Sequence, residues 1–256
     1  MKHTVLITGA TAGFGFATAR RFLSEGHQVI ATGRRQERLD ELKNSLPADQ
    51  QALLFTAVLD VCDSQAVAAF PKTLPAAFTN ISVLVNNAGL ALGLEPAHQA
   101  FLSDWDRMID TNVKGLVHMT RAITPGMVER KQGHIINLGS VAGTYPYPGG
   151  NVYGGTKAFV HQFSLNLRAD LIGTPIRVTS LEPGMCSGTE FSNVRFKGDD
   201  EKAGQVYSGV TALSAEDIAE SIFWVCTLPK HVNINTMEMM PVQQAFNPFN
   251  VHRQPV

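Results

Sequence analysis

The chain has 256 residues, of which 44% are hydrophobic and 17% are charged, and its formal net charge at pH 7 is −1. This length allows one large hydrophobic core and is short for two domains. The near-neutral charge gives no electrostatic reason to expect nucleic acid or an anionic membrane as a partner, and no segment approaches the ~20 apolar residues that span a bilayer.

The N-terminal sequence MKHTVLITG already contains the first expected strand, so we expect no signal peptide before it. Three scattered cysteines, Cys62, Cys186 and Cys226, are too few for a disulfide scaffold and fit reduced thiols. Both observations favour a cytoplasmic protein.

A glycine-rich turn follows the first strand. The apolar run 5–8 leads into TGATAGFG, and an alanine-rich helix follows that ends near Gly26. The spacing G-x-x-x-G-x-G differs from the familiar G-x-G-x-x-G, and a turn without a ligand is the alternative. The strand before and the helix after favour a dinucleotide pyrophosphate on the helix N-terminus. The residues expected to bind it are Thr8, Gly9, Thr11, Gly13, Phe14 and Gly15.

Two arginines follow the second strand, HQVIATG. An NAD enzyme of this architecture usually has an acidic residue here for the ribose 2′-hydroxyl, whereas this chain has Gly33, Arg34 and Arg35. Because a guanidinium fork suits a phosphate, we interpret Arg34 and Arg35 as a 2′-phosphate site and expect NADP. The alternative is a solvated basic start to the next helix, which is our interpretation of Arg38.

Apolar strand-like runs alternate with helical stretches along the chain. This pattern predicts a single α/β domain over residues 1–256, a doubly wound, Rossmann-like parallel sheet covered on both faces. The expected strands are 5–8, 28–31, 53–59, 83–85, 134–137, 177–181 and 234–238.

Two segments depart from the pattern. Residues 184–209 are rich in glycine and charge, and we expect a small substrate lobe there, since long ordered loops are often lids. The tail 241–256 contains prolines and asparagines, so we expect no helix; it is either frayed or lies on a neighbouring subunit.

The sequence YGGTK places Tyr153 and Lys157 four residues apart, thirteen residues after Ser140. On a helix these two side chains share a face, so we expect the ammonium to lower the pKa of the phenol. A tyrosine of this kind exchanges a proton with a carbonyl or alcohol oxygen, which Ser140 could also hold. Alone, the YxxxK pattern also fits a half-buried ring beside a solvated amine.

We expect no metal, because the eight histidines form no metal-binding pattern. His161 lies four residues after Lys157 and could extend the catalytic face. We favour packing within a helix or a subunit contact for His161.

Further motifs, LDV, NNAG, TNVKG, NLGS and LEPG, follow in the order found in the short-chain dehydrogenase/reductase family, which the chain closely resembles. The resemblance implies a catalytic tetrad of Asn112, Ser140, Tyr153 and Lys157, with Ser140 and Tyr153 also binding substrate. It implies that Asn112 fixes a water linking Lys157 to solvent. It also implies cofactor contacts for Tyr153 and Lys157, and for Asp60, Val61, Asn87, Gly89, Pro183, Gly184 and Thr189. Cys186 stands where the family often has valine or isoleucine.

Within that family, stretches such as NVYGGTKAFV and GTEFSNVRFKGDD resemble bacterial NADP-dependent 3-hydroxy acid dehydrogenases. The resemblance implies interconversion of small 3-hydroxy acids, such as serine, L-allo-threonine or 3-hydroxypropionate, with 3-oxo acids or semialdehydes. A broad-specificity carbonyl reductase of ketones and a non-catalytic NADP-sensing protein are the alternatives.

Two further expectations concern binding partners. Apolar residues spread widely around the helix 151–172, and many family members are tetramers, so we expect a homotetramer. A substrate carboxylate needs a cationic partner, for which Arg195 in the lobe is the candidate. A contact of Arg195 within the lobe or between subunits is the alternative. For Lys197 we expect a surface pair with Asp199 or Asp200.

Overall fold

The computed structural model describes residues 2–246. Seven strands form one parallel sheet in the order β3-β2-β1-β4-β5-β6-β7. The strands are β1 (Thr4–Ile7), β2 (Gln28–Gly33), β3 (Leu54–Val58), β4 (Val83–Asn86), β5 (Gly133–Leu138), β6 (Ile176–Pro183) and β7 (Thr236–Met239). Each corresponds to one apolar run of the sequence, so the prediction of a doubly wound parallel sheet is confirmed.

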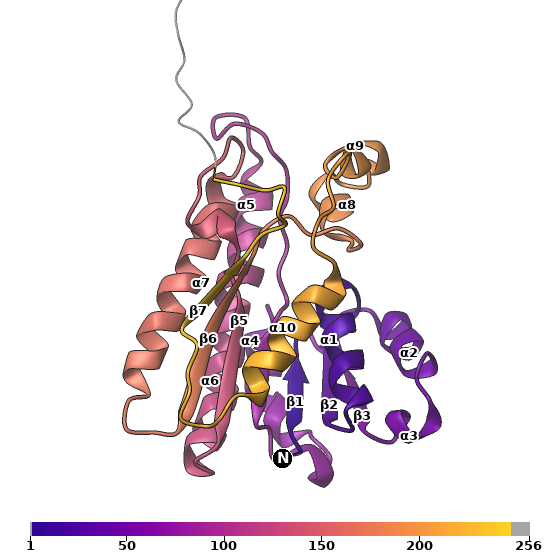
Figure 1. The fold of residues 1–256 in the computed structure, drawn as a ribbon, viewed down its shortest axis with the longest axis vertical. Coiled ribbons are helices and arrows are strands. Elements are labelled where there is room, and N and C mark those ends of the chain that lie inside the picture. Colours follow the sequence, from indigo (N-terminus) through magenta and orange to yellow (C-terminus); the bar gives the residue numbers. More distant parts are fainter. Residues whose placement is uncertain (1, 247–256) are drawn as a thin grey trace, which may run out of the picture.

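Helices connect the strands (Figure 1). The longer ones are α1 (Gly13–Ser24), α2 (Gln36–Asn44), α5 (Leu102–Ile109), α6 (Leu116–Glu129), α7 (Asn151–Asp170) and α10 (Ala215–Thr227). The shorter ones are α3 (Ala48–Gln51), α4 (Ser64–Ala69), η1 (Phe70–Lys72), η2 (Ala76–Phe78), η3 (Asp110–Gly115), η4 (Val141–Gly143), α8 (Phe191–Arg195) and α9 (Asp200–Gln205).

Alternate strand residues bury two separate cores. Val5 and Ile7 of β1 pack on the face covered by α1, α2 and α10, whereas Leu6 packs on the face covered by α4 and α6. Side chains along a strand point alternately to opposite faces, so a continuous apolar run fills both cores. This explains why the runs predicted strands buried on both sides.

The sheet order reverses at β1, whose neighbours are β2 and β4. In such folds ligands bind beyond the carboxyl ends of the strands at this switch point. Figure 1 shows α8 and α9 above that end of the sheet, opposite the N-terminus. Both short helices fall within the segment 184–209 that the sequence singled out as a lobe.

The start of the C-terminal tail lies on this chain's own lobe. Gln244 accepts a hydrogen bond from the N–H of Met185 at 2.7 Å, and Gln243 accepts one from the N–H of Thr211 at 2.6 Å. Residues 241–246 form no helix, as expected. The expectation of a frayed tail is wrong for these residues, because side-chain amides tie them to Met185, Gly209 and Thr211. The alternative, that the tail lies on a neighbouring subunit, stays a prediction, and residues 247–256 lie outside the described chain.

Candidate active site

The glycine loop is held in shape by polar side chains from the neighbouring strand end. Gly9 has φ +67°, and a Cβ there would lie 2.9 Å from the Cα of Ala88, so only glycine fits without strain. The amide of Asn87 donates to the carbonyl oxygens of Thr8 and Gly9 at 2.9 and 3.0 Å. The hydroxyl of Thr8 accepts from the N–H groups of Asn87 and Ala88. These hydrogen bonds fix the turn, and because Gly9 has no side chain, a pyrophosphate could approach the backbone closely at the start of α1.

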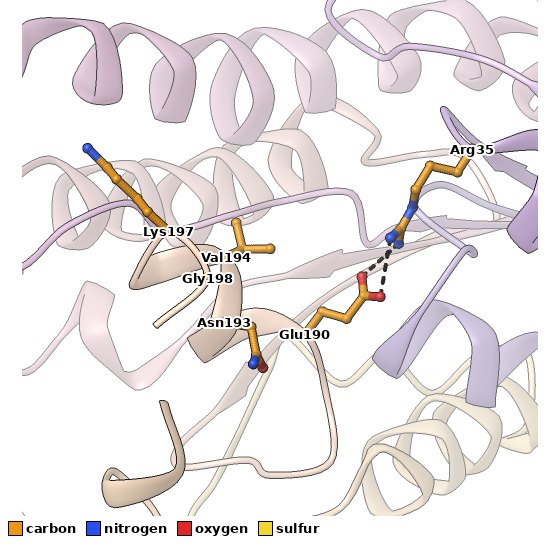
Figure 2. Close-up of a pocket in the computed structure, with 6 residues that line it drawn as sticks. All are labelled: Arg35, Glu190, Asn193, Val194, Lys197 and Gly198. Carbon is orange, nitrogen blue, oxygen red and sulfur yellow. Dashed lines mark hydrogen bonds and ion pairs between the residues drawn. The ribbon is translucent and has the colours of Figure 1, made fainter. Parts of the chain in front are cut away.

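The carboxylate of Glu190, in the lobe, forms an ion pair with Arg35, which follows β2 (Figure 2). Two nitrogens of the guanidinium donate to its two oxygens at 3.2 and 2.7 Å, and Thr11 accepts a third bond. Arg38 approaches the same carboxylate at 3.5 Å and also pairs with Glu41. Figure 2 shows this ion pair together with the other residues that line a pocket, Asn193, Val194, Lys197 and Gly198. The volume of this pocket is about 550 Å³. The lobe is thus tied across the cleft to the predicted 2′-phosphate site.

Asn112 lies in η3, a π-helical stretch between α5 and α6. The wider turn of a π-helix commonly marks a functional site. The Asn112 amide accepts from the N–H of Leu90 at 2.9 Å, and donates to the Leu90 carbonyl at 2.8 Å and to Thr156 at 3.1 Å. A Cβ at Gly89 would lie 3.3 Å from Asn112 Oδ1 and 3.7 Å from Lys157 Nζ. Asn112 therefore braces the strand end beside Lys157.

Three tetrad residues converge from β5 and α7. Ser140 follows β5; its hydroxyl caps η4 and lies 3.4 Å from the carbonyl oxygen of Pro183. Tyr153 and Lys157 lie one turn apart on α7, both buried. The ammonium of Lys157 donates to the carbonyl oxygen of Leu138 at 2.7 Å and lies 5.8 Å from the centre of the Tyr153 ring.

The expectation that the pKa of Tyr153 lies below its ordinary value is wrong for this structure. Burial raises the pKa of Tyr153, which outweighs the lowering by the Ser140 hydrogen bond and by the charge of Arg195. The ammonium of Lys157 is directed to the Leu138 carbonyl. Burial also lowers the pKa of Lys157 to about 8. The sequence showed the shared helix face and not the depth of burial.

Arg195 lies above the catalytic ring. Its guanidinium carbon is 5.6 Å from the centre of the Tyr153 ring and 5.3 Å from that of Tyr147. The same group donates to the hydroxyl of Tyr147 at 2.7 Å and to the carbonyl oxygen of Gly93 at 3.3 Å. The sequence marked Arg195 as a candidate but gave no sign of Tyr147, which the fold brings in from the loop after η4.

One cavity of about 770 Å³ joins these features. Its polar glycine-loop end and its tyrosine-rich end are continuous, which suits a long ligand with a small second molecule. The predicted residues that line it are Gly9, Thr11, Gly13, Phe14, Arg34, Arg35, Asp60, Val61, Asn87, Gly89, Ser140, Tyr153, Lys157, Pro183, Gly184 and Thr189. Thr8, Gly15 and Asn112 lie outside the lining and shape the backbone behind it.

Other titratable groups have structural partners. His161 bonds to the buried carboxylate of Glu182 at 2.6 Å, so it packs from its helix onto β6. Lys197 pairs with Asp104 at 2.8 Å and not with Asp199 or Asp200, because α8 carries it toward α5. Residues 2–246 contain no group of three or more His, Cys, Asp or Glu that could hold a metal ion.

The family model for short chain dehydrogenases matches residues 3–200. The chain belongs to the short-chain dehydrogenase/reductase family. This short-chain dehydrogenase is 64% identical over 250 residues to the NADP-dependent 3-hydroxy acid dehydrogenase YdfG of Escherichia coli strain K12, covering 98% of this chain and 99% of the relative. It is 53% identical to the serine 3-dehydrogenase of Rhizobium radiobacter, covering 99% of this chain and all of the relative.

A solved structure is similar throughout. The closed form of a serine dehydrogenase complexed with NADP+ superposes with a TM-score of 0.94 at 64% identity, covering 98% of this chain and 99% of that one. No helix among the described residues of this short-chain dehydrogenase is long and apolar enough to cross a membrane.

Proposed function

We propose that this protein is an NADP(H)-dependent oxidoreductase that interconverts small 3-hydroxy acids with 3-oxo acids or semialdehydes. The observation that carries the proposal is the single cavity that joins the glycine loop and Arg34 and Arg35 to Ser140 and Tyr153. Support comes from relatives that cover nearly the whole chain and whose names state NADP and 3-hydroxy acids or serine.

Ser140 and Tyr153 are proposed to hold the substrate's reacting oxygen, because both carry a hydroxyl and both line the cavity. In reduction, the phenol of Tyr153, the form that burial favours, gives its proton to the carbonyl oxygen as the carbonyl carbon takes up a hydride; in oxidation, the tyrosine oxygen takes the hydroxyl proton as the carbinol carbon gives up a hydride. When bound, NADP(H) supplies the acceptor or donor of that hydride. Lys157 joins α7 to the end of β5 through Leu138, and Asn112 joins η3 to the segment after β4 through Leu90.

The cofactor's adenosine end is assigned to Arg34 and Arg35. Arg34 and Arg35 both line the cavity, as do Asp60 and Val61, and Arg35 also pairs with Glu190. The residues fit the cofactor: an arginine pair suits a 2′-phosphate, and the bare glycine loop suits a pyrophosphate. The guanidinium of Arg35 already binds one anion, the carboxylate of Glu190, through both of its terminal nitrogens.

The function is tested by oxidation rates with NADP⁺ and NAD⁺ across serine, allo-threonine, 3-hydroxypropionate and an uncharged alcohol. We expect NADP⁺ and the acids to give the highest kcat/KM. Faster turnover of the uncharged alcohol would support a broad carbonyl reductase, and no turnover with NADP⁺ bound would support a sensor.

We also propose that each chain folds as one domain, that four chains form a homotetramer, and that the protein works in the cytoplasm. Phe159 on α7 and Trp224 on α10 are 38% and 47% exposed, which favours subunit contacts on two helices. All seven strands share one sheet, which favours one domain. The three cysteines are free thiols, as expected in a reducing compartment.

A further inference from the structure

The side chain of Arg195 is fixed at both of its ends. Its backbone carbonyl accepts from the N–H of Gly93 at 3.0 Å, and its Nε donates back to the Gly93 carbonyl at 3.3 Å. A terminal nitrogen donates to Tyr147 at 2.7 Å. These bonds hold the guanidinium over the ring of Tyr153, on the cavity side of α8.

Arg195 forms no ion pair with an Asp or Glu anywhere in residues 2–246. The other cations of the lobe and its edge differ: Lys197 pairs with Asp104 and Arg35 with Glu190. A partly buried cation is costly without a counter-ion, so a fixed one facing a cavity favours an anionic ligand. A guanidinium has five N–H donors, and the two side-chain bonds described leave donors free for that ligand.

We propose that Arg195 and Tyr147 form the subsite that binds the substrate's carboxylate. The inference rests on the proposed function and states how the site selects hydroxy acids over uncharged alcohols. Two C–C bonds of ~1.5 Å each separate the carbinol carbon of a 3-hydroxy acid from its carboxyl carbon. An acid whose hydroxyl meets Tyr153 therefore brings its carboxylate under a guanidinium that lies 5.6 Å from the ring centre.

Tyr147 completes the subsite through its own proton. Its oxygen accepts from Arg195, so its O–H remains to donate to a carboxylate oxygen. The other cation beside the Tyr153 ring is Lys157, whose ammonium is directed to Leu138. Of these two cations beside the Tyr153 ring, Arg195 is therefore the one available for the substrate.

The test compares 3-hydroxypropionate with its uncharged methyl ester, using NADP⁺ and the ratio of the two kcat/KM values. Arg195→Gln is expected to lower the acid-to-ester ratio by on the order of 10- to 100-fold, since it removes a charged hydrogen-bond donor. Tyr147→Phe should lower it less, and Arg195→Lys should retain part of it. Lys197→Gln removes the same charge two residues away and should leave the ratio unchanged.

Propionate, which has the carboxylate and no hydroxyl, gives a second measurement. It should inhibit ester oxidation competitively, with a Ki about 10-fold higher in Arg195→Gln than in the wild type. NADP⁺ affinity of each variant, followed by fluorescence, checks that it folds.

The outcomes separate the two proposals. If the wild type does not prefer the acid, the proposed function fails, whatever Arg195 does. If the wild type prefers the acid and Arg195→Gln keeps both the ratio and the propionate Ki, the carboxylate subsite is overturned. A loss shared equally by acid and ester also overturns it, because Arg195 would then only hold the lobe or act on Tyr153.

Discussion

The ammonium of Lys157 donates to the carbonyl oxygen of Leu138 at 2.7 Å, and Lys157 is only 8% exposed. The contact crosses from α7 to the end of β5, beside Ser140. Because burial lowers the pKa of Lys157 to about 8, the folded protein carries a buried amine that is charged at neutral pH at a cost in stability.

Lys157→Met should therefore raise the stability of the protein while abolishing turnover. Methionine has a similar length and no charge to bury, and the lowering of the Lys157 pKa from 10.5 to about 8 corresponds to roughly 3 kcal/mol. We expect a gain of about 1–2 kcal/mol, or a few degrees in Tm, measured by thermal unfolding. An unchanged or lower Tm would mean that the Leu138 contact outweighs the desolvation.

Tyr153→Phe should remove almost all turnover and leave NADPH binding nearly intact. The phenol supplies the proton, whereas the ring, packed on Phe191, only shapes the pocket. Steady-state kinetics and cofactor fluorescence measure the two effects. Retention of more than about a tenth of kcat would contradict the assignment, since acid–base catalysis usually contributes ~10² or more.

Replacing Arg34 and Arg35 together by Ala should raise KM for NADP⁺ far more than KM for NAD⁺. Only NADP⁺ carries the phosphate that the two guanidinium groups can bind. The matched control is Arg38→Ala, which removes an arginine held by Glu41 and should change both values little. Equal losses for both cofactors would make Arg34 and Arg35 ordinary surface charges.

Stability should fall in mild acid because of histidines buried in neutral form. Burial lowers the pKa of His3 to about 4, and it lowers those of His27 and His134. The charges of Arg177 and Lys230 also disfavour a charged His3. The unfolded chain binds protons near pH 6.5 and the folded protein does not, so stability is full above about pH 6.5 and is lost as pH falls toward about 4.

Urea unfolding at about pH 8 and about pH 5 measures this loss. The decrease in midpoint should be smaller in His3→Gln than in the wild type. His98→Gln, which replaces an exposed histidine, is the control. Equal decreases in all three proteins would rule out a contribution from His3.

Light scattering at micromolar concentration should give four times the mass of one chain. Trp224→Asp should lower that mass, because it places a charge on the exposed apolar face of α10. A monomeric wild type would refute the proposed tetramer.

The sequence predicted the sheet because apolar runs report burial on both faces, and each run became one strand. It also predicted the family, because the order of the motifs along the chain can be read from the sequence alone, and this prediction is confirmed. The Lys157–Leu138 contact and the raised pKa of Tyr153 could not be predicted, since both depend on depth in the folded protein. The pairing of Glu190 with Arg35 joins residues far apart in the chain and left no local signal.

The assignment of NADP and of 3-hydroxy acids agrees with the names of the relatives. The roles of individual site residues stay predictions, although most of those residues line one cavity. Gly15, Thr8 and Asn112 show why motif matching alone mixes two kinds of residue: those that face a ligand and those that hold the backbone behind it.

The single turn α8 is anchored at each end, by Glu190 to Arg35 and by Arg195 to Tyr147. An anion that displaces Glu190 from Arg35 releases one end of the helix whose other end carries Arg195, so any effect on a ligand at Arg195 is a coupling through α8. Such coupling is reciprocal by thermodynamic necessity: whatever factor the first ligand contributes to the affinity of the second, the second returns to the first. Two ligands that never touch the same side chain are thus linked through one short helix, and this coupling by itself favours neither of them as the first to bind.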